Sequence, residues 1–333
     1  MLLADIHLRT GSLDLAIEEA QEILKRDPKS IQAHLILGNI YLLKRDIPKA
    51  SKSFEEVIQI APNNPVGYYH KGRILLVQKR EKDALAQFEK ALSIQPNYLE
   101  ALNLIAVVYM NQKENKKALE RVEAQIKASP QNPFFYNMLG RLYEVNKEAG
   151  QAETNYKKAI ELNPNVAGFH TSLASFYIRQ DLTEKAIEGY NAALQKAPDS
   201  LSALMGLGII YDTQKKYEKA KEYYQKALKI NPKFAPAANN LAYLYAEKGE
   251  NIDEALNLAQ GAKEQFPDDP HISDTLGWVY YKKNIFTRAI TYLKEANEKI
   301  TDNPVMRYHL GMAYLKNGDN ENAKRELKKA LEL

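Results

Sequence analysis

Residues 201–234 read LSALMGLGIIYDTQKKYEKAKEYYQKALKINPKF and contain two successive helical patterns. In the first half Leu204, Leu207 and Tyr211 are spaced so that they share one face of a helix. The second half repeats the apolar spacing and ends at Pro232, because proline cannot continue a helix. The pattern predicts a helical hairpin of 34 residues. A single hairpin cannot bury the apolar faces of both helices, so it needs neighbours.

The hairpin recurs along the whole chain, which is the first property to test in a helical sequence. Two positions of the repeat carry small residues in all ten copies, and small side chains let two helices approach closely. Position 20 is always alanine: Ala16, Ala50, Ala84, Ala118, Ala152, Ala186, Ala220, Ala255, Ala289 and Ala323. Position 8 is glycine or alanine: Ala4, Gly38, Gly72, Ala106, Gly140, Ala174, Gly208, Ala242, Gly277 and Gly311. Position 11 is tyrosine in eight copies and position 32 is proline in eight.

These positions together match the signature of the tetratricopeptide repeat (TPR) family, and the chain resembles that family over its whole length. The resemblance implies an all-α fold, a right-handed superhelical solenoid of ten helix-turn-helix repeats. We predict a single TPR array over residues 1–333. Its repeats span about 1–30, 31–64, 65–98, 99–132, 133–166, 167–200, 201–234, 235–269, 270–303 and 304–333. Because Met1 falls inside a first helix and Leu333 directly follows a second, we expect the array to be cut from a longer protein.

Local chemistry predicts where several hairpins begin and where one departs from the pattern. Four repeats begin with Asn or Asp followed by Pro, a sequence that caps a helix and starts it cleanly. These pairs are Asn64-Pro65, Asn132-Pro133, Asp269-Pro270 and Asn303-Pro304. The repeat at 235–269 has one extra residue, which we expect in the turn at 249–253 because turns tolerate insertions best.

Composition excludes several classes of function. The chain has 46 Lys and Arg against 42 Asp and Glu, and a net charge of +4 is too weak to indicate nucleic-acid binding. There is no cysteine, so disulfides and thiolate chemistry are excluded. No apolar run is long enough to span a membrane, and we expect no direct membrane insertion of this segment.

The residues also predict no catalytic, cofactor or metal site. The six histidines lie in six different repeats, and none has the helical partner that a zinc site would need. Glycines never form a phosphate-binding loop after a strand, since no strand is expected. We therefore predict that the segment is not an enzyme.

The TPR resemblance implies a binding groove, because positions 2, 5, 6, 9, 12 and 13 of the first helices face the concave side in that family. The predicted lining residues are Leu35, Asn39, Leu42, Tyr69, Arg73, Leu76, Val107, Met110, Arg141, Arg179, Tyr243, Trp278, Tyr281, Tyr308 and Met312. The lining is apolar in repeats 2 to 4, which suits an amphipathic helix or an extended peptide. It is aromatic in repeats 8 to 10, where a second interpretation is that the rings only pack between neighbouring first helices.

Three functions remain open from sequence. The first is a non-catalytic scaffold that binds a protein segment in the groove, and the second is a regulatory or targeting arm of a larger enzyme. The third is self-association through the chain ends, around Leu327, Ala330 and Leu331. Residues 239–270, 274–284 and 308–331 resemble the closing repeats of bacterial TPR proteins, including lipoproteins linked to exopolysaccharide export and the exosortase (PEP-CTERM) system. That resemblance implies an envelope assembly and a periplasmic or envelope location, with the cytoplasm as the alternative.

Overall fold

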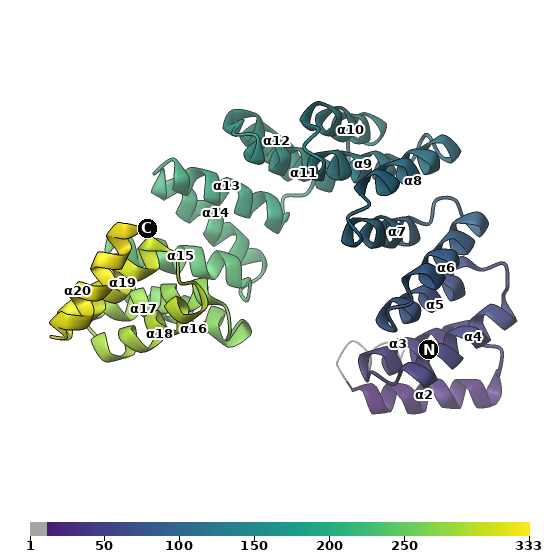
Figure 1. The fold of residues 1–333 in the computed structure, drawn as a ribbon, viewed down its shortest axis with the longest axis horizontal. Helices are drawn as coiled ribbons and strands as arrows, with labels where there is room; N and C mark the ends of the chain where they lie inside the picture. Colours follow the sequence, from purple (N-terminus) through teal and green to yellow (C-terminus); the bar gives the residue numbers. More distant parts are fainter. Residues whose placement is uncertain (1–11) are drawn as a thin grey trace. The chain divides into compact units, whose positions relative to one another are not determined.

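The computed structural model describes residues 12–333, and every regular element in that part of the chain is a helix (Figure 1). There are 19 helices over the described residues, which confirms the predicted all-α class. The first helix of the first predicted repeat, with Ala4, lies outside the described residues.

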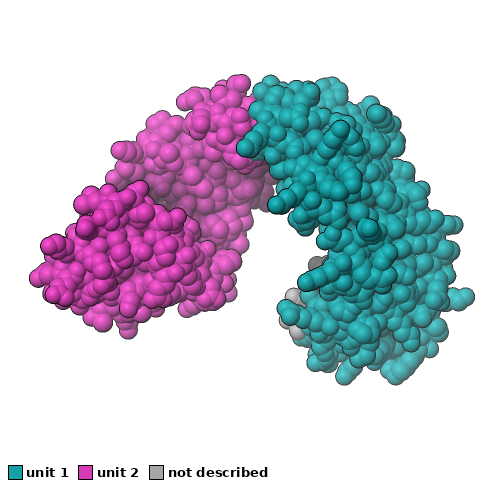
Figure 2. Space-filling model, in the orientation of Figure 1, with its two compact units in different colours: residues 1–164 teal, residues 165–333 magenta. Residues whose placement is uncertain are grey.

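The chain divides into two compact units, residues 1–164 and residues 165–333, coloured teal and magenta in Figure 2. The first unit contains α2 (Leu13–Arg26), α3 (Ile31–Leu43), α4 (Ile47–Ile60), α5 (Pro65–Val77), α6 (Glu81–Ile94), α7 (Leu99–Asn111), α8 (Asn115–Ala128), α9 (Pro133–Val145) and α10 (Ala149–Leu162). The second unit contains α11 (Ala167–Arg179), α12 (Thr183–Lys196), α13 (Leu201–Thr213), α14 (Tyr217–Ile230), α15 (Ala235–Lys248), α16 (Ile252–Gln265), α17 (Pro270–Lys282), α18 (Phe286–Lys299), α19 (Pro304–Lys316) and α20 (Asn320–Glu332). From α3 onward each predicted repeat holds one hairpin, whose first helix we call helix A and whose second we call helix B. That all ten repeats form one array stays a prediction.

The alanine at position 20 is buried in every repeat, at the place where helix B meets helix A. Its exposed fraction is 0% in nine repeats and 2% at Ala323. Within each unit, a helix A packs against helix B of its own repeat and helix B of the preceding one, as α5 does with α6 and α4. The stacking therefore buries both faces that a lone hairpin would leave exposed.

The stacked hairpins share continuous apolar cores. In the first unit one cluster of buried side chains extends from Leu75 to Leu142, through three successive repeats. In the second unit another extends from Leu204 to Ala323. Each repeat contributes part of a core that its neighbours complete, so the array grows by addition of similar interfaces.

Position 8 is small because a large side chain from position 24 of helix B lies against it. A Cβ atom built on Gly72 would lie 2.4 Å from Cε1 of Phe88, and one on Gly208 would lie 2.4 Å from Cε1 of Tyr224. Both ring residues are fully buried. The glycine thus provides the space that the ring fills, which is a packing role that the sequence pattern predicts.

Helix starts follow the predicted capping chemistry. The side chains of Asn64, Asn132, Asp269 and Asn303 each accept a hydrogen bond from a backbone N–H two residues later. Proline occupies the first helical position after each of them. Since these bonds satisfy donors that have no partner inside the helix, all four caps are confirmed.

The extra residue of the eighth repeat lies in the turn between α15 and α16, which confirms that prediction. The backbone N–H of Glu250 donates to the carbonyl of Tyr245, as the N–H of Asp46 does to the carbonyl of Tyr41, so the two helix ends are equivalent up to Glu250. Asn251 is then inserted in the left-handed conformation at φ 44°, directly before α16 begins. Gly249 also has a left-handed conformation, at φ 68°, which glycine adopts without steric cost.

Candidate functional site

A hollow of about 750 Å³ in the first unit is formed by the A helices α3, α5 and α7. Its lining residues are Asn39, Leu42, Leu43, Tyr69, Arg73, Leu76, Val77 and Leu104. All eight occupy repeat positions 5, 6, 9, 12 or 13, the positions from which the groove was predicted. The structure therefore brings five predicted lining residues together at one place: Asn39, Leu42, Tyr69, Arg73 and Leu76.

Exposed apolar side chains give the hollow its character. Leu43 is 65% exposed and Val77 is 59% exposed, although both belong to helices whose opposite faces are buried. Large apolar residues gathered on an accessible surface often mark a site of interaction with another molecule. The surface formed by Leu43 and Val77 is thus suited to contact an apolar side chain of a partner.

Arg73 supplies the one cationic group among the residues that line this hollow, and its neighbours hold it in place. Its guanidinium carbon lies 5.8 Å from the centre of the Tyr69 ring, and its Nη1 donates to Nδ1 of His70 at 3.1 Å. His70 stacks on Phe54, with ring centres 4.5 Å apart. Burial, followed by the charge of Arg73, lowers the pKa of His70 to about 4. The imidazole is therefore neutral at pH 7 and accepts the hydrogen bond from Arg73.

Tyr69 is also fixed by contacts with two further aromatic rings. Its ring meets Tyr98 edge-on at 5.3 Å and lies 6.1 Å from Phe88. Burial raises the pKa of Tyr98 to about 12. The wall formed by Tyr69 and Arg73 is thus built on a packed cluster and needs little ordering when a partner binds.

Three predicted residues of the first unit lie near this hollow without lining it. Leu35 packs against the core cluster around Phe54, and Met110 packs against the cluster that continues through α7. Val107, on α7, is 38% exposed. Arg141 lies on α9, is exposed, and does not take part in the hollow.

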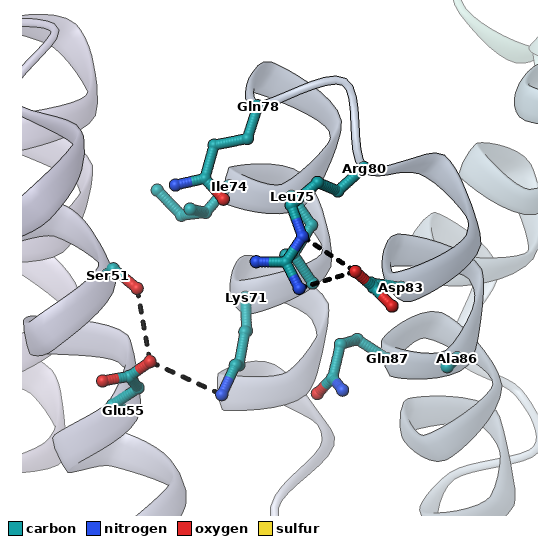
Figure 3. Close-up of a pocket in the computed structure, with 10 residues that line it drawn as sticks. All are labelled: Ser51, Glu55, Lys71, Ile74, Leu75, Gln78, Arg80, Asp83, Ala86 and Gln87. Atoms are coloured by element: carbon teal, nitrogen blue, oxygen red, sulfur yellow. Dashed lines mark hydrogen bonds and ion pairs between the residues drawn. The ribbon is translucent and has the colours of Figure 1, made fainter.

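A second hollow of the first unit is polar and lies between α4, α5 and α6 (Figure 3). Lys71 occupies position 7, where the other repeats carry Leu or Ile, and its Nζ lies 3.4 Å from a carboxylate oxygen of Glu55. Arg80 pairs with Asp83 at 2.6 Å on the other side. These charged groups satisfy one another, so Lys71 has a structural explanation.

The second unit has a hollow of about 360 Å³ formed by the A helices α13, α15 and α17 with the start of α19. Its lining residues are Ile209, Asp212, Thr213, Tyr224, Asn239, Asn240, Tyr243, His271, Asp274, Thr275, Asn303, Val305 and Met306. Two are carboxylates and none is lysine or arginine. Tyr243 is one of the predicted groove residues. Other lining residues, among them Asp212, Asn239 and Asp274, also occupy the repeat positions that face the groove.

Electrostatics in this hollow are dominated by acidic groups. Burial raises the pKa of Asp212 above its ordinary value, and the charge of Lys248 opposes that shift. Burial, then the charges of Glu247, Asp274 and Asp212, raises the pKa of Tyr243 to about 12. Each shift reflects the cost of placing negative charge where water is excluded.

The aromatic residues of repeats 8 to 10 form one cluster, whose centre at Trp278 and His309 is buried. Trp278 is 4% exposed, and its ring stacks on Tyr281 at 4.5 Å and on His309 at 4.1 Å. Its indole Nε1 donates to the Glu247 carboxylate. The ring therefore packs among α15, α17 and α19, as the second interpretation of these residues proposed. Tyr308 is 46% exposed, and Tyr243 and Tyr281 are partly buried, so these three rings reach solvent.

The other predicted residues of the second unit are partly buried or distant from the hollow. Tyr281 and Met312 are partly buried against the large core cluster. Arg179 is exposed near the end of α11 and does not line the hollow. Over residues 12–333, no three His, Asp or Glu side chains are grouped closely enough to hold a metal ion. No helix among the described residues has the length and apolarity needed to cross a membrane.

Stacked helical hairpins with accessible hollows along their A helices define a helical-repeat protein. Sequence models described as tetratricopeptide repeat match residues 1–65, 75–142, 137–200, 202–234, 223–257 and 305–333. The chain belongs to the TPR family, whose repeats generally mediate protein–protein interaction and typically form non-catalytic scaffolds.

Three known proteins illustrate the extent of the similarity. The TPR repeat-containing protein PA4667 of Pseudomonas aeruginosa is 36% identical over 77 residues, which are 23% of this chain and 13% of that protein. A crystal structure of a tetratricopeptide repeat protein from Parabacteroides merdae covers 70% of this chain and 92% of its own, with a TM-score of 0.52 and 22% identity. The APC/C hetero-tetramer Cut9-Hcn1 aligns with 99% of this chain over 72% of the matched chain, with a TM-score of 0.59 and 17% identity. Both structural similarities concern the fold alone.

Proposed function

We propose that this chain is a non-catalytic scaffold that binds a segment of a partner protein along the A helices of its repeats. The observation that supports this function best is the apolar hollow of the first unit, whose lining residues all occupy groove positions. Leu43 and Val77 expose most of their surface there, beside the fixed guanidinium of Arg73. This combination suits a segment with an apolar side chain next to a carboxylate, because the carboxylate can pair with Arg73.

A photo-crosslinking amino acid in place of Leu43 tests the proposal directly in cells of the source organism. Crosslinking from this position should yield a discrete covalent adduct with a partner protein. Lys52, on helix B of the same repeat, is exposed and provides the matched control position. Adducts of equal yield from both positions, or none from Leu43, would refute binding in the hollow.

The affinity for the partner so identified should then depend on the apolar lining. Leu43 is 65% exposed, and burial of a whole leucine side chain contributes about 1.5–3 kcal/mol. Leu43→Ala should therefore weaken binding by about 1–2 kcal/mol, which is roughly tenfold. Helical content should not change, because most of this side chain is already in water. An unchanged dissociation constant would show that the partner binds elsewhere.

The finer proposal is that the assembly belongs to a bacterial envelope. Its support is the resemblance of residues 239–270, 274–284 and 308–331 to bacterial TPR proteins of export and sorting systems. Fractionation of the source cells tests this part, since recovery in the cytoplasm would contradict it. A catalytic domain in the natural flanking sequence would instead support the alternative function, a regulatory arm of an enzyme.

A further inference from the structure

One carboxylate oxygen in the hollow of the second unit has no hydrogen-bond partner although it is buried. Asp274, on α17, is 6% exposed, and its Oδ2 pairs with Nδ1 of His309 at 2.9 Å. Its Oδ1 is inaccessible and makes no hydrogen bond. A buried acceptor without a donor is destabilising, and most of all when it carries charge.

A second acceptor in the same hollow is also unpaired. Asn239, on α15, directs its amide nitrogen toward Asn240 at 3.5 Å, and its Oδ1 is buried without a hydrogen bond. Among the described residues five buried side-chain atoms lack partners, and two of them belong to this hollow. Asp274 is the only carboxylate of the five. The hollow therefore concentrates acceptors that lack donors.

The surrounding charges favour a cation over an anion. Asp212 lines the hollow with Asp274, and no lysine or arginine does. The charge of Lys248 acts on Asp212 in the direction that lowers its pKa, and this ammonium lies 3.4 Å from the centre of the Tyr217 ring. Burial still raises the pKa of Asp212, so this lysine does not compensate for the loss of water. An added positive charge with N–H donors would stabilise both carboxylates.

The remaining lining favours an organic cation. Tyr243 presents an aromatic ring, and aromatic faces attract ammonium and guanidinium groups. Metal ions need several hard ligands together, and no suitable group of three occurs among residues 12–333. The volume of about 360 Å³ is near the lower end of the range for ligand pockets, about 300–1,000 Å³, so it has room for one long side chain.

We propose that this hollow receives a lysine or arginine side chain of the bound protein segment, with Asp274 and Asp212 as its charge partners and Asn239 as a further acceptor. The proposal rests on the proposed function, because it assigns one chemical feature to the segment that the scaffold binds. It predicts that the partner carries a basic residue in the part that contacts α13, α15 and α17.

The test uses the full chain and the peptide acetyl-Leu-Arg-Leu-amide, with the same peptide containing citrulline as the neutral control of equal shape. Binding is followed by methyl NMR of Ile209 and Met306, which line the hollow. The arginine peptide should shift both methyl signals with saturation, and the citrulline peptide should bind at least tenfold more weakly. Affinity should also fall as salt is raised, since the attraction is between opposite charges.

Variants locate the site. Asp274→Asn keeps the size of the side chain and should weaken arginine-peptide binding at least tenfold, and Asp212→Asn should weaken it less. Asp199→Asn removes the same charge from an exposed loop position and should leave binding unchanged. If Asp274→Asn loses helical content, the peptide affinity of Asp212→Asn, compared with that of Asp199→Asn, decides the test. Equal binding of the two peptides, or equal affinity of Asp212→Asn and Asp199→Asn, would overturn the proposal.

The outcome also separates this inference from the proposed function. If the Leu43 crosslink yields a partner while the arginine peptide fails to bind, the scaffold function stands and the cation site is wrong. If the peptide binds and no partner crosslinks, the cation site stands and the apolar hollow is not the binding surface. Calcium chloride is titrated in parallel, and methyl shifts of equal size with calcium would contradict an organic cation.

Discussion

The packing of position 8 against position 24 makes a quantitative prediction about Gly72 and Phe88. Gly72→Ala would place Cβ 2.4 Å from Cε1 of Phe88, about 1 Å closer than the 3.4 Å at which ordinary contacts begin. The ring is fully buried and cannot turn into solvent. Such overpacking costs about 1–3 kcal/mol, and alanine regains about 1 kcal/mol over glycine through helix propensity. The difference between the two effects is a net loss of about 0–2 kcal/mol, and the overlap with a buried ring atom places the expected loss in the upper half of that range.

The neighbouring repeat shows how this loss can be relieved. There Ala106 and Val122 occupy the same two positions, and both are buried. Phe88→Val alone should cost about 2–4 kcal/mol, because it leaves a cavity beside Gly72. In the double variant the alanine methyl enters that cavity. The destabilisation of the double variant should therefore be smaller than the sum of the two single destabilisations by about 1–2 kcal/mol.

The assay is urea unfolding followed by far-ultraviolet circular dichroism, for the wild type, both single variants and the double variant. Because repeat arrays can unfold in parts, amide hydrogen exchange in α5 and α6 serves as a local measure of the same free energies. A coupling energy near zero would refute the reasoning, since it would mean that the small residue and the ring do not share space.

Three further predictions follow from burial and charge. Gly261→Ala, in helix α16, meets no atom within 4 Å and should raise the free energy of unfolding by about 0.5–1 kcal/mol in urea titrations; a decrease would contradict the packing at that site. Ala186→Leu should lower the free energy of unfolding by about 1–3 kcal/mol, measured by thermal or urea unfolding, because Ala186 is fully buried. Glu188→Leu, on the exposed face of the same helix, should change it by less than about 0.5 kcal/mol. Equal effects would refute the assignment of buried and exposed positions in the repeat. The pKa of His70 is about 4 in the folded chain, whereas the ordinary value is 6.5, so between these pH values the folded state binds fewer protons than the unfolded state. The free energy of unfolding should therefore fall as pH falls from 6.5 to about 4, by at most about 1.4 kcal/mol per pH unit. Urea unfolding of His70→Gln should show a weaker pH dependence than the wild type, and identical pH profiles would contradict the assignment.

Much of the fold could be predicted from sequence because the signals are local and repeated. The caps at Asn64 and Asp269, the burial of every position-20 alanine that the structure describes, and the all-α class each follow from a residue and its near neighbours. The position rule also selected every residue that lines the apolar hollow of the first unit. Helical periodicity fixes which face of a helix turns inward, whatever the identity of the neighbouring repeat.

The sequence alone determined the hairpins, their register and the set of candidate groove residues. Tertiary structure decided which of those residues remain available. Trp278 is buried because His309, from the next repeat, stacks on it, and Asp274 has one paired and one unpaired oxygen because that same histidine reaches only one of them. The physical reason is that burial and hydrogen bonding at these positions depend on side chains about 31 to 35 residues away in sequence, which no local pattern specifies.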